Sequence, residues 1–124
     1  MEKADRFNDG KTKLGLVPLD CHKWEADGFA YGANKYSMNN WRKGLPIMDQ
    51  ANSLFRHLNA FLNENEDIDP ESGVHHLGLA QCNLTMMVNT IQHHPELDDR
   101  FKLKKIENEE ILERNKIKME FRNK

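Results

Sequence analysis

The sequence contains few cysteines and no motif in which cysteine usually binds a metal or forms a disulfide framework. Cys21 and Cys82 are its two cysteines, and neither lies in a CxxC pair or at a Cys/His ligand spacing. This pattern argues against a disulfide scaffold and a zinc site, and we expect two reduced, buried thiols. The GxxxxGKS/T, GxGxxG, GxSxG and HExxH motifs are also missing. The signatures of P-loop, Rossmann, hydrolase and zincin chemistry are therefore absent.

An excess of positive charge and a long apolar segment are missing as well. The 18 Lys and Arg residues are balanced by 20 Asp and Glu, which gives a formal net charge of -2. That balance excludes strong steering toward a nucleic-acid polymer or an anionic membrane. Apolar stretches are only a handful of residues long, and the charged start of the chain is not followed by an apolar region. We expect no membrane span and no export signal, and hence a cytoplasmic protein.

The residues that are present predict one all-α domain. With 124 residues, 38% of them hydrophobic, the chain can form a single core. Apolar residues recur every three or four positions over residues 18–36, 47–63 and 72–93, which predicts three helices. We expect a compact helical bundle of these three core helices, with an ordered N-terminal arm before them and a charged C-terminal helix after them.

The charge distribution changes near residue 98 and suggests a division of the chain. Residues 1–98 hold nine Lys and Arg against fourteen Asp and Glu, whereas residues 99–124 hold nine against six. We interpret 1–98 as the helical domain and 99–124 as a charged helix that Asp98 or Asp99 can cap. Its irregularly spaced apolar residues suggest that this helix docks on a partner subunit, so we expect a homo-oligomer. They are Leu103, Ile106, Ile111, Leu112, Ile117, Met119 and Phe121.

The second and third predicted helices differ in how they distribute polar residues. Over 47–63, an apolar stripe lies opposite polar residues that include Ser53, Arg56 and His57. The helix predicted over 72–93, which Ser72 can cap, is apolar around nearly its whole circumference. His76 and Asn83 are exceptions two turns apart on this helix, so they point the same way and need hydrogen-bond partners. The stripe of the second helix consists of Met48, Ala51, Phe55, Leu58 and Leu62.

An acidic connector joins these two helices. Residues 64–71 contain five carboxylates, among them Glu66, Asp69 and Glu71. Carboxylates at this density favour a hard divalent cation such as Mg²⁺, which binds few carboxylates and the phosphate oxygens of a nucleotide. A solvated acidic loop beside a hydrogen-bonded core histidine explains the same pattern, and spacing alone favours that explanation.

A second group of residues is cationic or aromatic and suits a nucleotide. Lysine and arginine with exposed turn amides can bind phosphate, and an aromatic ring beside them can contact a base or a sugar. Alternatively, Trp41 and Tyr36 cover helix ends and the cations are surface charges, which spacing alone again favours. The group comprises Lys11, Lys13, Lys35, Tyr36, Asn40, Trp41, Arg42 and Lys43.

Several short motifs, taken in order over about residues 8–92, resemble the small bacteriophage proteins of the dATP/dGTP diphosphohydrolase family. The motifs are Asn8-Asp9-Gly10-Lys11, Tyr31-Gly32-Ala33-Asn34-Lys35-Tyr36, Asn40-Trp41-Arg42-Lys43-Gly44, Arg56-His57-Leu58, Asp69-Pro70-Glu71-Ser72-Gly73, and His76-Leu77 with Asn83. The resemblance implies an all-helical protein related to MazG-type pyrophosphohydrolases, which use Mg²⁺ to cleave nucleoside triphosphates between the α and β phosphates. It also implies that a phage-encoded protein of this kind works in the host cytoplasm.

The resemblance assigns candidate roles to residues of this chain. It implies Glu66, Asp69 and Glu71 as Mg²⁺ ligands, and His57 and His76 as ligands or proton carriers. Asn83 would orient one of these histidines or a water molecule. The phosphate contacts would be Lys11, Lys13, Lys35 and Arg56, with Tyr36, Asn40 and Trp41 as further substrate-binding residues.

One departure from the family pattern bears on activity. Where the family often has a histidine three residues after His76, this chain has Leu79. That position shares a helix face with His76, so the change removes one possible ligand or proton-transfer group.

Three functions are consistent with the sequence. The first is a Mg²⁺-dependent pyrophosphohydrolase that converts dATP or dGTP to the monophosphate and pyrophosphate. The second is a non-catalytic phage protein that sequesters a nucleotide or a nucleotide-derived immune signal, for which Leu79 is the support. The third is an interaction module whose charged final helix binds another protein.

Overall fold

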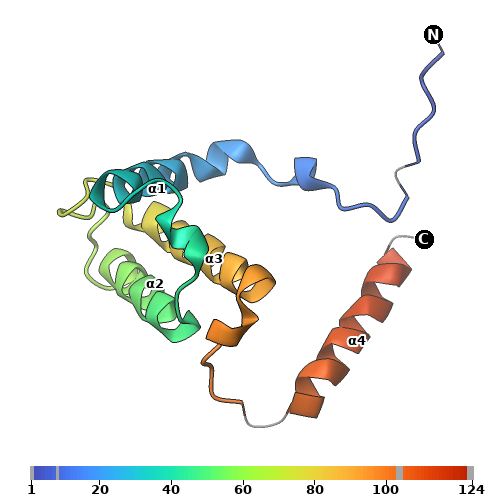
Figure 1. Ribbon diagram of the computed structural model, residues 1–124. Coiled ribbons are helices and arrows are strands. Elements are labelled where there is room, and N and C mark those ends of the chain that lie inside the picture. Colours follow the sequence, from blue (N-terminus) through green and yellow to red (C-terminus); the bar gives the residue numbers. More distant parts are fainter. Residues whose placement is uncertain (1, 8, 103–104, 123–124) are drawn as a thin grey trace.

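A computed structural model of the chain describes residues 2–7, 9–102 and 105–122, and it is all-α, as the sequence predicts (Figure 1). Its α-helices are α1 (Lys23–Lys35), α2 (Ile47–Leu62), α3 (His76–His93) and α4 (Lys105–Arg122). Four short 3-10 helices lie between or before them, at Leu14–Leu16, Leu19–His22, Asn40–Lys43 and Pro95–Leu97. The first three α-helices form the packed unit, because α1 and α2 both pack against α3.

Helix α1 approaches α3 closely because glycines lie at their crossing. A Cβ atom added to Gly78 of α3 would lie 2.6 Å from the backbone carbonyl carbon of Trp24, and one added to Gly28 of α1 would lie 2.6 Å from Cys82 Sγ. Neither position has room for a side chain. Gly28 and Gly78 therefore allow the close approach of the two helices, whereas a Cβ atom added to Gly32 would have open space around it.

Helix α2 buries a different stripe from the one predicted. Ala51 is buried, but Met48, Phe55 and Leu62 are 39%, 59% and 64% exposed, so the predicted stripe is wrong at these three positions. The buried side chains instead follow the line from Ile47 through Gln50 and Ala51 to Leu54 and Ala60. The buried face of α2 therefore differs from the predicted apolar stripe, and it includes the polar side chain of Gln50.

Helix α3 begins later than predicted, and one of its apolar faces is exposed. Its first residue is His76, and the N-cap is His75, whose Nδ1 accepts a hydrogen bond from the Leu77 amide at 3.0 Å. Ser72 therefore does not cap this helix, because it lies in the preceding turn. The outer face carries Leu84 and Val88, which are 50% and 54% exposed, so the apolar residues of this helix are not all buried.

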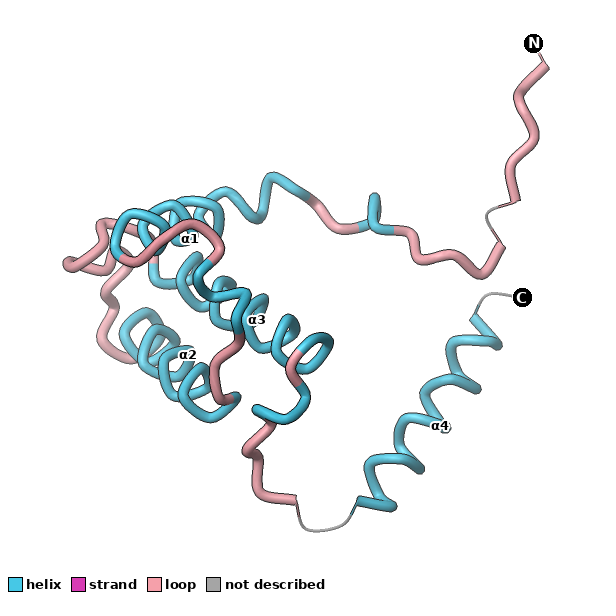
Figure 2. The backbone as a smooth tube through the Cα atoms, viewed as in Figure 1, coloured by secondary structure: helices cyan, strands magenta, loops and turns pink. Residues whose placement is uncertain are grey.

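The two ends of the chain lie outside the three-helix unit. The described residues up to Pro18 are exposed and mostly extended, with a 3-10 turn at Leu14–Leu16 (Figure 2). Cys21 is exposed, which corrects the expectation that both thiols are buried, while Cys82 is buried. None of the helices that the structure describes is long and apolar enough to cross a membrane.

Helix α4 stands apart from the other helices (Figure 1). It begins at Lys105, so neither Asp98 nor Asp99 caps it: Asp98 binds Arg100, and Asp99 accepts a hydrogen bond from the Met48 amide at 2.9 Å. The described side chains Glu110–Glu120 are all exposed, including Ile111, Leu112, Ile117 and Met119. Leu103 lies outside the described residues, as do the side chains of Ile106 and Phe121. The division of the chain near residue 98 stays a prediction.

Candidate functional site

A cavity of about 330 Å³ lies between α1 and α2, with α3 as its floor. It forms because the two helices pack on α3 side by side, and the segment from Ser37 to Leu45 closes one end. Six residues predicted from the sequence line it together, although they come from three separate parts of the chain. These are Lys35, Tyr36, Asn40, Trp41, His57 and Asn83.

Aromatic and cationic groups lie in and beside the cavity wall. The Trp41 ring lies 4.9 Å from the ring of Phe29, and the Arg42 guanidinium lies 4.8 Å from the Trp41 ring centre. Lys35 Nζ is 5.5 Å from the centre of the Tyr36 ring. Aromatic faces bind bases by stacking, and cations bind phosphates, so a wall that holds Trp41 and Lys35 has both properties that a nucleotide needs.

Lys35 is held by the acidic connector. Its Nζ donates to Glu71 Oε1 at 3.0 Å, and the Tyr31 hydroxyl donates to the same oxygen at 3.3 Å. The Glu71 carboxylate raises the pKa of Lys35, so the amine stays protonated. Glu71 therefore positions a cation at the rim of the cavity.

A chain of hydrogen bonds leads from the acidic connector to the cavity. Glu66 Oε1 lies 2.7 Å from His76 Nε2, and His76 Nδ1 lies 2.9 Å from His57 Nδ1. His76 is buried, whereas His57 lines the cavity. The adjoining helices thus bring both predicted histidines and one predicted carboxylate together.

The tautomers of these histidines follow from their partners. An ionised carboxylate only accepts, so His76 Nε2 carries the proton that faces Glu66. In neutral His76 the other nitrogen, Nδ1, then accepts from His57 Nδ1–H. This assignment leaves a lone pair on His57 Nε2, and no side chain within the described residues hydrogen-bonds to that nitrogen. Burial, together with the neighbouring His76, lowers the pKa of His57, so the neutral ring is favoured.

The three predicted Mg²⁺ ligands do not converge on one point. Glu66 binds His76, Glu71 binds Lys35, and Asp69 accepts hydrogen bonds from the Ser72 amide at 3.0 Å and hydroxyl at 2.7 Å. Partial burial opposes ionisation of Asp69, but the bonds from Ser72 outweigh it and lower its pKa. Across the part of the chain that the structure describes, no cluster of three His, Cys, Asp or Glu side chains could hold a metal ion. The predicted ligand set does not fit Mg²⁺ in this arrangement.

Three predicted phosphate contacts lie away from the cavity. Lys11 and Lys13 are on the exposed N-terminal arm, and Arg56 is exposed on α2 without lining the cavity. Arg56 is adjacent to His57, and neighbouring side chains on a helix point about 100° apart. Arg56 therefore points away from the cavity that His57 lines. Of the predicted phosphate-binding cations, Lys35 is therefore the one that lines the cavity.

Asn83 and Leu79 occupy neighbouring positions on the cavity floor. Asn83 is buried and donates from Nδ2 to Ser53 Oγ at 3.2 Å, so it is oriented by Ser53. Leu79, one turn earlier on α3, also lines the cavity. An apolar side chain therefore lies in the cavity wall at position 79.

Sequence reasoning missed several lining residues. Asp49, Gln50 and Ser53 lie on the same face of α2 as His57. Ser53 lies four residues before His57, and Gln50 and Asp49 lie three and four residues before Ser53, which is the helical spacing that could have found them. Gln50 was overlooked because a buried glutamine has no distinctive local pattern. Phe29 and Tyr31 of α1 line the cavity as well.

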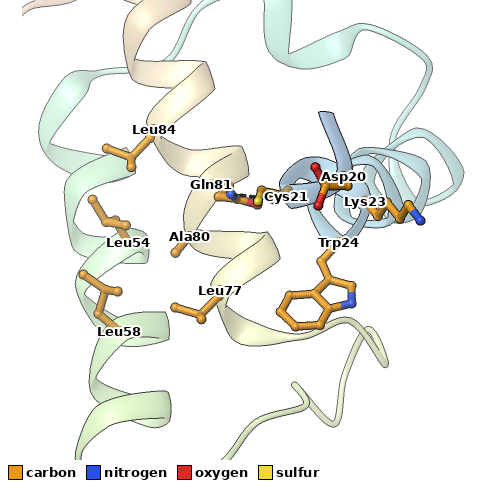
Figure 3. Close-up of a pocket in the computed structure, with 10 residues that line it drawn as sticks. All are labelled: Asp20, Cys21, Lys23, Trp24, Leu54, Leu58, Leu77, Ala80, Gln81 and Leu84. Atoms are coloured by element: carbon orange, nitrogen blue, oxygen red, sulfur yellow. Dashed lines mark hydrogen bonds between the residues drawn. The ribbon is translucent and has the colours of Figure 1, made fainter. Parts of the chain in front are cut away.

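A second cavity of about 660 Å³ lies on the opposite face of α3 (Figure 3). Leu54 and Leu58 of α2 border it on one side, and Trp24 lies on the other (Figure 3). Its α3 residues, Leu77, Ala80, Gln81 and Leu84, are mainly apolar. It lacks the convergent polar groups of the smaller cavity, so the smaller one is the better candidate for chemistry.

Comparisons with known proteins agree with the resemblance. The family model described as dATP/dGTP diphosphohydrolase, N-terminal, matches residues 1–100. A protein of Salmonella phage PMBT28 named dATP/dGTP diphosphohydrolase is 32% identical over 95 residues, which are 77% of this chain and 32% of that protein. The chain spans about a third of that relative's length. No solved structure gives a significant match. This chain belongs to the dATP/dGTP diphosphohydrolase N-terminal family.

Proposed function

We propose that the chain binds a purine deoxynucleoside triphosphate in the cavity between α1 and α2 and hydrolyses it to the monophosphate and pyrophosphate. The observation that carries the proposal is the convergence of Trp41, Lys35 and His57 on one cavity. These residues supply a stacking surface, a cation and a base, three groups that the reaction can use. The family and its phage relative support this substrate class.

The reaction assigns a role to each group. His57 Nε2 accepts a proton from a water molecule whose oxygen attacks the α-phosphorus, and the bond to the oxygen bridging the α and β phosphates breaks. Pyrophosphate leaves with that oxygen. Glu66 stabilises the positive charge that forms on the histidine pair, as the carboxylate does in a Ser-His-Asp triad. Asn83 orients the water or the phosphate, and Lys35 offsets phosphate charge.

We also propose that Mg²⁺ takes part in the hydrolysis and that it enters the cavity bound to the nucleotide. Triphosphates carry Mg²⁺ on their own oxygens, so the ion does not depend on the connector carboxylates for delivery. Hydrolysis measured against increasing Mg²⁺, with a chelator as control, tests this point. Full activity in excess chelator would contradict it.

Sequestration of a nucleotide without cleavage is the second candidate function. Leu79 in the cavity wall favours it, because an apolar group replaces one that could move a proton or hold an ion. Binding then uses Trp41 and Lys35, while the histidine pair is structural.

One experiment separates the two functions. Purified protein is incubated with dATP or dGTP and Mg²⁺, the products are separated by chromatography, and binding is measured by calorimetry. Monophosphate and pyrophosphate that disappear in His57→Ala support hydrolysis. Stoichiometric binding with full recovery of intact nucleotide supports sequestration, and no binding rejects both.

We further propose that copies of the chain associate. Exposed apolar side chains on α4 and on the outer face of α3 offer surfaces for association, such as Ile111 and Leu84. Light scattering on the full chain after size exclusion is expected to give a mass above that of one chain. A monomer at micromolar concentration would contradict this proposal.

A further inference from the structure

Asp49 supplies the one carboxylate among the described residues that line the smaller cavity. It lies in the first turn of α2, and its side chain is exposed. The adjacent Gln50 is buried and donates to the Leu45 carbonyl. By contrast, the Asp49 carboxylate forms no hydrogen bond or ion pair with any residue that the structure describes. An accessible acceptor is therefore available to a molecule in the cavity.

Helix α2 sets the distance between this carboxylate and the proposed base of the reaction. Asp49, Ser53 and His57 follow one another at intervals of four residues, and all three line the cavity. Eight residues of helix span about 12 Å along the axis. That span is comparable with the length of a nucleoside monophosphate, from its phosphorus to the far edge of its base. With the α-phosphorus at His57, the base of the nucleotide therefore reaches Asp49.

Contacts with α3 place these two residues at opposite ends of the cavity. His57 contacts His76, which is the first residue of α3. Gln50, next to Asp49, donates instead to Thr90 in the last turn of α3 at 3.1 Å. We name the end at Asp49 the base end and the end at His57 the phosphate end.

The aromatic and cationic groups of the cavity follow the same direction. The carbonyl of Arg42, next to Trp41, accepts from His94 Nε2 at 2.8 Å, and His94 follows the last residue of α3. Trp41 therefore belongs to the base end. Lys35 pairs with Glu71, in the connector that precedes the first residue of α3. The cation thus belongs to the phosphate end, away from the unpaired carboxylate.

The chemistry of a carboxylate limits which base it can bind. Both oxygens of an ionised Asp49 only accept, so a matching base edge presents N–H groups. Guanine presents two of them side by side, N1–H and the 2-amino group, and a carboxylate can accept from both. Adenine presents the lone pair of its ring N1 beside the 6-amino group, which places one acceptor against another. The carboxylate therefore favours guanine.

We propose that Asp49 makes the site selective for guanine, by accepting hydrogen bonds from N1–H and the 2-amino group of a base stacked on Trp41. The inference rests on the proposed nucleotide-binding function and names guanine as its preferred base. It also gives the cavity a direction, with the base at Asp49 and the phosphates at Lys35 and His57.

The first test compares three bases on the wild-type chain. Calorimetry in the presence of Mg²⁺ uses analogues of dGTP, dITP and dATP in which a methylene group replaces the oxygen between the α and β phosphates, so that no cleavage occurs. Hypoxanthine keeps N1–H but lacks the 2-amino group. We expect the dGTP analogue to bind about tenfold more tightly than the dITP analogue and about a hundredfold more tightly than the dATP analogue. Equal affinities overturn the role of Asp49 and leave the proposed function intact, whereas failure of all three to bind overturns both.

The second test substitutes the carboxylate. Asp49→Asn keeps the size of the side chain, but its amide both donates and accepts, as the adenine edge requires. We expect the dGTP analogue to bind at least about tenfold more weakly, so that the preference for guanine over adenine falls to about tenfold or less. Asp27→Asn is the matched control, since Asp27 is exposed on α1 and lines neither of the two cavities. It should keep the affinities of the wild type.

Two results of the second test overturn the proposal. One is a folded Asp49→Asn variant, as judged by circular dichroism, with the affinities of the wild type. The other is a variant that loses the same factor for the dGTP and dATP analogues, because a carboxylate that holds the Mg²⁺ of the nucleotide gives that result. If the variant does not fold, the comparison of the three bases on the wild-type chain decides.

Discussion

His57 and His76 face each other through the same ring nitrogen, with 2.9 Å between their Nδ1 atoms. A hydrogen bond between two such nitrogens needs one proton, so the two rings cannot both be imidazolium while the contact persists. Glu66 contacts the other ring nitrogen of His76, Nε2. The negative charge of this carboxylate can therefore stabilise, through His76, a proton that His57 gains at Nε2. The geometry therefore joins an acidic loop to a cavity through two helices.

The first prediction concerns Glu66. Replacement by Gln keeps the size of the side chain but removes the negative charge that stabilises the histidine pair, so we expect hydrolysis to fall about tenfold to a hundredfold. The measurement is the rate of pyrophosphate release from dATP or dGTP. Glu64→Gln is the control, because Glu64 lies in the same connector, is exposed, and accepts a hydrogen bond from Asn59 of α2. Equal rates in the two variants would show that Glu66 has no role in the reaction.

The second prediction concerns pH and His57. Its pKa is lowered in the folded protein, mainly by burial, so the unfolded chain binds this proton at higher pH than the folded chain does. The stabilisation is complete above the pKa of the unfolded chain, about 6.5, and decreases as the pH falls through and below that value. We expect a lower Tm at about pH 5.5 than at about pH 7.5, and a weaker dependence in His57→Asn. His93→Asn, at an exposed position on α3, should keep the dependence of the wild type.

The third prediction concerns the contact between α1 and α3. Gly78→Ala forces a methyl group against the Trp24 backbone, and we expect a loss of about 1–3 kcal/mol in the free energy of unfolding. Gly32→Ala is the matched control, since it has open space and alanine favours a helix by about 1 kcal/mol. Urea denaturation followed by circular dichroism measures both. A Gly78→Ala protein as stable as wild type would mean that the helices can separate at no cost.

The fourth prediction concerns Lys35. Its ion pair with Glu71 is solvent-exposed, so Lys35→Ala should change the stability little. Its position at the rim of the cavity predicts a larger effect on nucleotide binding, of about tenfold or more. Calorimetry is the measurement. Lys23→Ala is the control, because Lys23 borders the apolar cavity on the other face of α3. Unchanged affinity in Lys35→Ala would remove it from the phosphate-binding residues.

The fifth prediction uses the two tryptophans. Trp41 lies in the smaller cavity and Trp24 in the larger, so each reports on one face of α3. In Trp24→Phe, addition of dATP or dGTP should still quench the remaining fluorescence, because the base stacks on Trp41. In Trp41→Phe, quenching should be lost while the emission of Trp24 stays. The reverse result would place the nucleotide in the apolar cavity.

The pattern of the sequence was sufficient to predict that the protein is helical and where most helices lie. Residue spacing located α1, α2 and α3 to within a few residues, since local periodicity follows from the geometry of a helix. The start of α3 was missed because the N-cap is a histidine rather than Ser72. The stripe on α2 was misread at Phe55 and Leu62, because which face is buried depends on the partner helix.

Sequence by itself thus determined the all-α class, the placement of α1, α2 and α3, and the family, because these depend on local periodicity and on ordered motifs. Tertiary structure decided which polar residues meet. It brought Trp41, Lys35 and His57 to one cavity, left Arg56 outside, and gave Glu66 a histidine rather than a shared metal site as its partner. The physical reason is that a side chain's neighbours depend on how helices distant in sequence cross, and one residue's shift turns it by about 100°.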